Sequence, residues 1–183
     1  MECERLAVRL VPPNAAWAAQ AAAEGARLAD AVGKALVVTH HIGSTAIPGI
    51  QAKPTIDLLP LVSSLAALDA REEAVRALGY DWRGEFGLPG RRFCSLTQNG
   101  LRLFNAHFYA DGAADVARHL AFRDYLRTHP DEARAYEAEK VRAAALRPDD
   151  VLAYNDQKND WIKACEQRAL AWSAIEGAGA GVR

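Results

Sequence analysis

The chain has 183 residues, of which 50% are hydrophobic and 25% are charged, and its formal net charge is −1 at pH 7. This composition is typical of a globular protein with one sizeable core. A nearly neutral chain gives no general electrostatic reason to expect nucleic acid or a membrane as a partner, so any anion must be recognised by local groups. The three cysteines are far apart and in no metal-ligand spacing, which favours a reduced, cytoplasmic protein without disulfides. We expect neither a signal peptide nor a membrane-spanning segment.

The first half of the chain is expected to alternate between strands and helices. A β-like run at 6–11 ends at two prolines, and Asn14 then caps an alanine-rich helix that closes at Gly33. The β-branched content and apolar spacing of the next segments predict strands over 36–42 and 55–62 and a helix over 65–78.

The second half is expected to form a β-hairpin and then only helices. Asn99-Gly100 is a strong hairpin turn signal, and it lies between predicted strands at 92–97 and 101–109; a further strand begins at 80–82. From Ala113 to about Trp172 the pattern is helical, with breaks at two X-Pro sites where proline fits a first helical turn. This order predicts an α+β fold, with helices on one side of a mixed β-sheet and a C-terminal helical segment. We expect one domain over residues 1–176 and a flexible, glycine-rich tail at 177–183.

The stretch from His40 to Leu59 combines turn chemistry with polar groups in apolar surroundings. A buried strand that ends in Gly43-Ser44 can offer backbone N–H groups and a hydroxyl to an anion. Asp57 on the following strand is placed to hold a metal beside that anion. Lys53 lies between the two halves of the loop and is a candidate phosphate ligand.

Strand alternation selects the side chains that can join Asp57. Side chains two residues apart share a face of a strand, so Asn105 and His107 point the same way, as Asp57 and Leu59 do. If the two strands belong to one continuous sheet, Asp57, Asn105 and His107 converge. His107 is then a candidate metal ligand, and a hydrogen-bonded core histidine is the alternative.

Each of the three C-terminal helical segments places one cation inside its apolar stripe. These cations are Arg123, Lys140 and Lys158. Burying a charge is costly unless it is paired, so two interpretations stay open. The three cations form a wall for a polyphosphate, or they form salt bridges and extend their stems to the surface. Arg92, which follows a glycine-dense loop, is either a phosphate ligand or a solvated charge.

Common catalytic motifs are absent. Gly43 and Gly49 are not followed by Gly-Lys-Ser/Thr, so there is no Walker A loop, and the Gly-x-Ser-x-Gly elbow of a serine hydrolase is missing.

Several blocks resemble one family. They are 41–49 (HIGSTAIPG), 52–57 (AKPTID), 79–80 (GY), 90–92 (GRR), 105–107 (NAH), 122–127 (FRDYLR), 136–140 (YEAEK) and 154–158 (YNDQK). On these blocks the chain is similar to the GrpB (UPF0157) family of the nucleotidyltransferase-like superfamily. The resemblance implies a nucleotidyltransferase-like mixed β-sheet flanked by helices. It also implies a Gly-Ser turn for phosphate and acids that hold Mg²⁺ or another divalent cation. Gly43 and Ser44 match the turn and Asp57 matches the first acid, whereas Leu59 stands where a second acid is expected.

Two functions follow from these features. In the first, the chain is a divergent nucleotidyltransferase-like protein that binds a nucleotide or another phosphorylated small molecule and performs metal-dependent nucleotidyl or phosphoryl transfer. Asp57 and His107 are then the catalytic and metal-binding residues, and the substrate is held by His41, Gly43, Ser44, Lys53, Arg92, Asn105, Arg123, Lys140 and Lys158. In the second, the chain is a non-catalytic ligand-binding or folding-accessory module, like the domain beside dephospho-CoA kinase.

Overall fold

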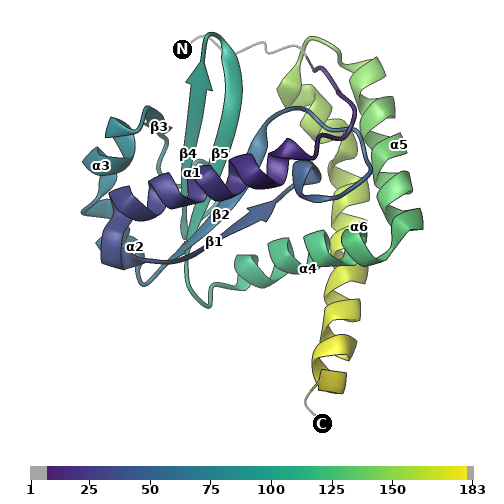
Figure 1. Cartoon of the computed structure of the whole chain (residues 1–183). Coiled ribbons are helices and arrows are strands. Elements are labelled where there is room, and N and C mark those ends of the chain that lie inside the picture. The colour runs from purple at the N-terminus through teal and green to yellow at the C-terminus, as the bar shows by residue number, and fades with distance from the viewer. Residues whose placement is uncertain (1–7, 181–183) are drawn as a thin grey trace.

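A computed structural model describes the backbone of residues 8–180 and the side chains up to Glu176. Five strands form one mixed sheet in the order β1-β2-β5-β4-β3 (Figure 1). Only β2 and β5 pair in parallel; the other neighbours are antiparallel. The strands are β1 (Leu36–Ile42), β2 (Ile56–Val62), β3 (Tyr80–Trp82), β4 (Arg91–Gln98) and β5 (Leu101–Ala110).

Helices cover both faces of this sheet, as the family resemblance implied, so the placement on one side that the element order predicted is wrong. Figure 1 shows α1 lying across one face, which we call the α1 face, and α5 and α6 running side by side. The opposite face, which packs against α4, is called the α4 face. The helices are α1 (Ala16–Val32), α2 (Leu65–Asp69), α3 (Glu72–Ala77), α4 (Ala114–Thr128), α5 (Pro130–Leu146) and α6 (Val151–Ala180); short 3₁₀ turns occupy η1 (Gly33–Ala35) and η2 (Ser44–Ala46).

The alternation of strand side chains divides the core between the two faces. Leu58 is fully buried on the α1 face, in a cluster with Leu28 of α1 and Phe108 of β5. Leu59 is fully buried on the α4 face, in a cluster with Tyr109 and with Val116 of α4. A third cluster joins α4, α5 and α6, and it includes Ile47 and Ile50 of the loop before β2.

The expected α+β architecture is confirmed, and most elements lie where the pattern predicted them. Asn99 and Gly100 form the hairpin turn with φ values of 51° and 75°, as a two-residue turn of the primed type requires. Pro130 begins α5 as expected. Of the predicted run at 6–11, positions 6 and 7 lie outside the described residues, and Val11 forms an isolated bridge with Ala52.

The helix predicted over 65–78 is interrupted and forms two short helices. Arg71 lies between α2 and α3 and has left the helical conformation, with φ −110° and ψ 7°. Its guanidinium donates a hydrogen bond of 3.1 Å to the carbonyl oxygen of Ala31 in the last turn of α1. The break between α2 and α3 therefore coincides with a long-range hydrogen bond to a carbonyl group at the end of α1. Spacing within residues 65–78 does not predict such a break.

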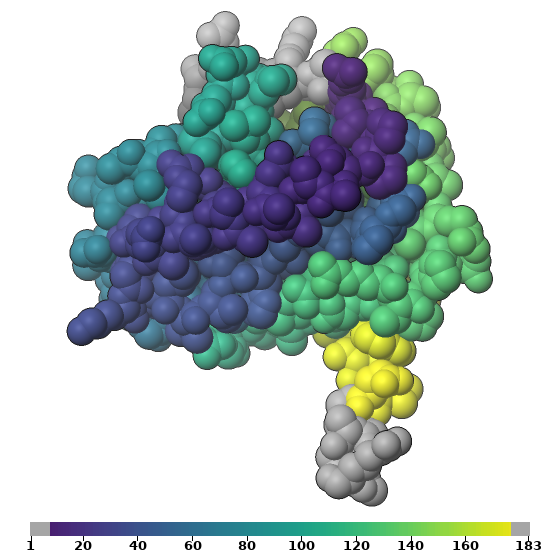
Figure 2. All heavy atoms as spheres, in the orientation of Figure 1, coloured from purple at the N-terminus to yellow at the C-terminus, as the bar shows by residue number. Residues whose placement is uncertain are grey.

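The last helix extends beyond the expected end near Trp172 and runs to Ala180. The part of α6 that ends at Glu176 projects away from the body of the protein, as the space-filling view shows (Figure 2). Among the described helices, none is both long and apolar enough to cross a bilayer. Cys94 and Cys165 are buried free thiols, and Cys3 lies outside the described residues.

Candidate functional site

Asp57 is the centre of a polar group on the α4 face. The parallel pairing of β2 with β5 places Asp57 directly opposite Asn105. Asn105 Nδ2 donates a hydrogen bond of 2.9 Å to Asp57 Oδ1, and His107 Nε2 lies 3.5 Å from the same oxygen. The predicted convergence of these three residues is therefore confirmed.

The surroundings of Asp57 favour its ionised form. Burial alone would raise the pKa of Asp57, but contact with His107, the hydrogen bond from Asn105 and the charge of Lys53 hold that pKa below its usual value. Asn105 is itself oriented, because Arg102 Nη1 donates to its Oδ1 at 3.3 Å. His107 Nδ1 is buried and has no hydrogen-bond partner among the described residues.

The Gly43-Ser44 turn packs directly on this acid. Gly43 has a φ of +70°, and a Cβ placed on it would lie 2.4 Å from Asp57 Oδ2. The first turn of η2 follows at once, and its second residue, Thr45, shares a 2.9 Å hydrogen bond with His41 Nε2. Burial is the main reason why the pKa of His41 falls to about 4, so His41 is neutral at pH 7 and holds the turn rather than supplying charge.

Lys53 and Lys158 converge on one aromatic ring. The Nζ atoms of Lys53 and Lys158 lie 5.1 and 4.5 Å from the ring centroid of Tyr154, which is itself 1% exposed. Among the described residues neither ammonium has a carboxylate within salt-bridge distance. Burial, followed by the charge of Lys53, lowers the pKa of Lys158 to about 7, although Asp57 opposes the shift. Burial likewise lowers the pKa of Lys53.

Lys140 joins this group from α5 and fixes the loop before β2. It is 1% exposed, and its Nζ donates a hydrogen bond to the carbonyl oxygen of Gln51. Glu137, one turn earlier, accepts a 2.6 Å hydrogen bond from the backbone N–H of the same residue, Gln51. Burial lowers the pKa of Lys140 to about 8, with Glu137 opposing the shift. The charge of Lys140 also lowers the pKa of Lys158, so the two ammonium groups act on each other.

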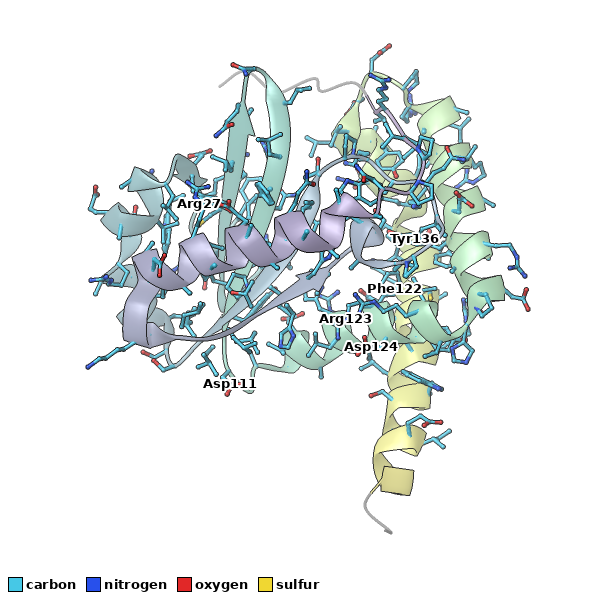
Figure 3. All side chains as sticks on the ribbon, in the orientation of Figure 1. Arg27, Asp111, Phe122, Arg123, Asp124 and Tyr136 are labelled. Carbon is cyan, nitrogen blue, oxygen red and sulfur yellow. The ribbon has the colours of Figure 1, made fainter. Side chains whose placement is uncertain are left out.

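Arg123 is paired instead of contributing an open charge to this group. Its Nε and Nη2 atoms donate to the two carboxylate oxygens of Asp124, at 2.7 and 2.9 Å, and Figure 3 shows the two residues side by side on α4. Nη1 also reaches the carbonyl oxygen of His41 at 3.3 Å. Of the two interpretations of the helix cations, the salt bridge therefore holds for Arg123.

The structure does not bring Arg92 to this group, although the sequence analysis included it. Arg92 pairs with Phe108, so its side chain points to the α1 face and forms hydrogen bonds of 2.7 and 2.8 Å with Asp69. The reason is a β-bulge beside the hairpin turn. The register at the turn would place Arg92 opposite His107, and the bulge between Leu96 and Thr97 moves it opposite Phe108.

The donor set does not fit a two-metal centre. Leu59 shares the face of Asp57 but is 0% exposed in an apolar cluster. Among the residues that the structure describes, no group of three or more His, Cys, Asp or Glu is placed to hold a metal ion. Asp57 and His107 supply one carboxylate and one imidazole, whereas Mg²⁺ prefers several oxygen ligands.

Two contributors were missed by the sequence analysis. The sequence analysis named Tyr154 only as part of the 154–158 block and gave it no role, although it precedes Lys158 by four residues and the i,i+4 spacing predicts contact between them. Arg102 orients Asn105 from three residues earlier on β5 and lowers the pKa of Lys53 by its charge. Strict alternation places Arg102 and Asn105 on opposite faces of the strand, so the sequence did not predict their contact.

Comparison with known proteins identifies relatives for nearly the whole chain. The family model described as "GrpB protein" matches residues 7–168. The UPF0157 protein YqkA of Bacillus subtilis is 40% identical over 90% of this chain and 48% of its own length. The UPF0157 protein SCO7215 of Streptomyces coelicolor is 37% identical over 92% of this chain and 87% of its own length. A dephospho-CoA kinase of Mycolicibacterium paratuberculosis is 34% identical over 94% of this chain and 48% of its own length.

The fold is shared with a solved structure. The crystal structure of the conserved protein GrpB from Enterococcus faecalis has a TM-score of 0.85 and 34% sequence identity, and it matches 90% of this chain and 99% of that chain. The present chain thus corresponds to the whole of that structure, but it spans about half the length of YqkA and of the kinase.

Proposed function

Because this chain belongs to the GrpB family and the charges of Lys53 and Lys158 both act on one oriented acid, Asp57, we propose that it binds a phosphorylated small molecule, with a phosphate group between Lys53 and Lys158. The Gly43-Ser44 turn packs on Asp57, and in this proposal it offers backbone N–H groups to the same ligand. Whether the ligand is a nucleotide is taken up in the next subsection.

One observation carries this proposal. Lys53 and Lys158 share the Tyr154 ring, and among the described residues no carboxylate forms a salt bridge with either of them. Two partly buried like charges without counter-ions are costly, and a bound anion removes that cost. A dianionic phosphate suits the site better than a carboxylate, since Lys140 adds a third nearby charge.

The metal ligands available at this site limit any group transfer to chemistry that needs one divalent cation. Asp57 is ionised and oriented by Asn105, so it can hold one divalent cation together with oxygen atoms from the ligand's own phosphates. The proposal assigns His107 to positioning Asp57, because its Nε2 faces that carboxylate.

A second candidate, a non-catalytic accessory module, is favoured by the burial of Leu59. An apolar residue that is 0% exposed replaces the acid that a two-metal transferase would carry on this strand. Proteins named dephospho-CoA kinase contain a segment similar to this chain over about half their length, which supports a role beside another domain.

Calorimetric titration with sodium tripolyphosphate tests the binding proposal. We expect Lys158→Met to weaken binding about tenfold or more, which corresponds to about 1.4 kcal/mol. Lys163→Met is the matched control, because Lys163 is an exposed lysine of the same helix and should leave binding unchanged. If wild-type protein binds neither tripolyphosphate nor a nucleoside triphosphate, or if Lys158→Met folds and binds tripolyphosphate as wild type does, the proposal fails.

Titration with and without Mg²⁺ separates the two candidate functions. Asp57→Ala removes a negative charge, so without metal it should strengthen anion binding, and with Mg²⁺ it should weaken it if one ion bridges Asp57 and the phosphate. Release of pyrophosphate from nucleoside triphosphates that depends on both Mg²⁺ and Asp57 supports transfer. Binding without any turnover supports the accessory module.

A further inference from the structure

The loop between β3 and β4 presents a large aromatic side chain at the surface. Phe86 is 54% exposed, and its φ of 45° lies in the left-handed region that favours glycine. Non-glycine residues in this region are strained, and such strain is concentrated at binding and catalytic sites. A phenylalanine that served only to fill the core would need neither the exposure nor the strain.

Hydrogen bonds hold this loop in its conformation. Arg91, which is 8% exposed, donates to the carbonyl oxygen of Phe86 at 2.7 Å and to that of Glu85 at 3.3 Å. The Glu85 carboxylate in turn accepts a 2.8 Å hydrogen bond from the N–H of Gly90. The exposed position of the Phe86 ring is therefore built into the loop and is prepared before any ligand arrives.

A row of rings connects Phe86 to the candidate site. Phe86 stacks on Phe93 with a centroid distance of 5.2 Å and an interplanar angle of 19°. Phe93 stands opposite His107 in the sheet, and their ring centroids are 5.1 Å apart. His107 contacts Asp57 at 3.5 Å, so two ring steps separate the surface aromatic from the polar group on the α4 face.

A cationic side chain, that of Arg83, lies over the ring of Phe86. The guanidinium of Arg83 is 5.4 Å from the centroid of Phe86 and is also hydrogen-bonded to Asp81 at 2.7 Å. Planar guanidinium groups and aromatic rings are the two side-chain surfaces on which nucleobases stack.

We propose that Phe86, supported by Phe93 and flanked by Arg83, is a stacking platform for the base of a nucleotide whose phosphates lie at Lys53 and Lys158. This inference rests on the proposed phosphate site and assigns the ligand to the nucleoside polyphosphates, as opposed to sugar phosphates or inorganic polyphosphate. The ring contacts of 5.2 and 5.1 Å and the 3.5 Å approach of His107 to Asp57 connect this platform to the acid on which the charge of Lys53 acts.

Calorimetry on the full chain with three ligands tests the platform. ATP has both a base and a triphosphate, whereas methyl triphosphate and tripolyphosphate have only the charges. We expect ATP to bind wild-type protein about tenfold or more tightly than methyl triphosphate, which is the order of magnitude of one base stack. Phe86→Ala should remove most of this difference and leave tripolyphosphate affinity unchanged, while Phe86→Tyr should keep it.

Leu88→Ala is the matched control, since Leu88 is a 42% exposed apolar residue of the same loop. If none of the three ligands binds, the phosphate site itself is wrong. If all three bind wild-type protein equally, the phosphate site stands and the platform is overturned, and this result needs no variant. A folded Phe86→Ala variant that weakens ATP and tripolyphosphate by the same factor, or an equal loss of ATP affinity in Leu88→Ala, also overturns the platform.

Discussion

Gly43 and Asp57 lie so close together that a Cβ on Gly43 would be 2.4 Å from Oδ2 of the acid and 3.0 Å from its Cβ. The turn that follows β1 and the acid near the start of β2 are therefore one packed unit, and neither can change without affecting the other. The strand pairing explains the contact, because Asp57 stands opposite Ile42, the residue before the glycine.

We expect Gly43→Ala to lower the free energy of unfolding by roughly 2–4 kcal/mol, from a positive φ and a steric clash together. Gly49→Ala is the control, since Gly49 has a φ of +81° but no atom within 4 Å of the position that a Cβ would take, and it should lose only about 1–2 kcal/mol. Urea denaturation measures both values. Equal losses in the two variants would show that the contact with Asp57 carries no energy.

The apolar residue at position 59 has a structural role. Leu59 is 0% exposed and packs with Ile42, Leu61, Tyr109 and Val116. We expect Leu59→Ala to lower the free energy of unfolding by about 2–5 kcal/mol. Leu59→Asp should be more severe, because it buries an unpaired charge, and it should not create a metal site.

Urea denaturation and Mg²⁺ titration of the folded variants check this expectation. Leu101→Ala, at a position that is 65% exposed, should stay within about 0.5 kcal/mol of wild type. A stable Leu59→Asp variant that binds Mg²⁺ would contradict the argument that packing alone determines this position.

The depressed pKa of Lys158 predicts how stability depends on pH. The pKa of Lys158 is about 7 in the folded protein, mainly through burial, and 10.5 is its ordinary value. Between these two values the unfolded chain binds more protons than the folded chain, so the free energy of unfolding rises with pH over this range. The stability that the folded protein gains when Lys158 is deprotonated is fully present above pH 10.5 and is lost as the pH falls through about 7.

Urea denaturation in phosphate-free buffer from pH 7 to 9.5 should therefore show a shallower rise in Lys158→Met than in wild type. Lys163→Met should keep the wild-type slope, because Lys163 is exposed. Identical slopes in all three proteins would mean that Lys158 keeps its ordinary pKa when folded.

Arg123 and Arg92 should contribute to stability and not to anion binding. Each forms two hydrogen bonds with one carboxylate, Arg123 with Asp124 and Arg92 with Asp69. Since both pairs are partly exposed, we expect Arg123→Met and Arg92→Met each to cost about 1 kcal/mol or less. Their affinity for tripolyphosphate should equal that of wild type, and a tenfold loss in Arg123→Met would place Arg123 in the site.

The sequence by itself determined most helices and strands and the polar group on the α4 face. Periodicity and turn residues predicted the strands, the Asn99-Gly100 hairpin and most helix boundaries, because these depend on neighbours a few residues away. Alternation along single strands also predicted that Asp57, Asn105 and His107 share one face, which required only that β2 and β5 be neighbours.

Only the tertiary structure decided which cations lie near the polar group of Asp57, Asn105 and His107. A single bulge, whose extra residue is Leu103 of β5, places Arg92 on the opposite face of the sheet from His107, and no local pattern marks that residue. The contact of Lys53 with Tyr154 joins a loop to a helix about a hundred residues later in the chain. Such a contact depends on how the layers pack. The sequence shows which residues carry charge, and the packing decides which of the described charges lack a salt-bridge partner.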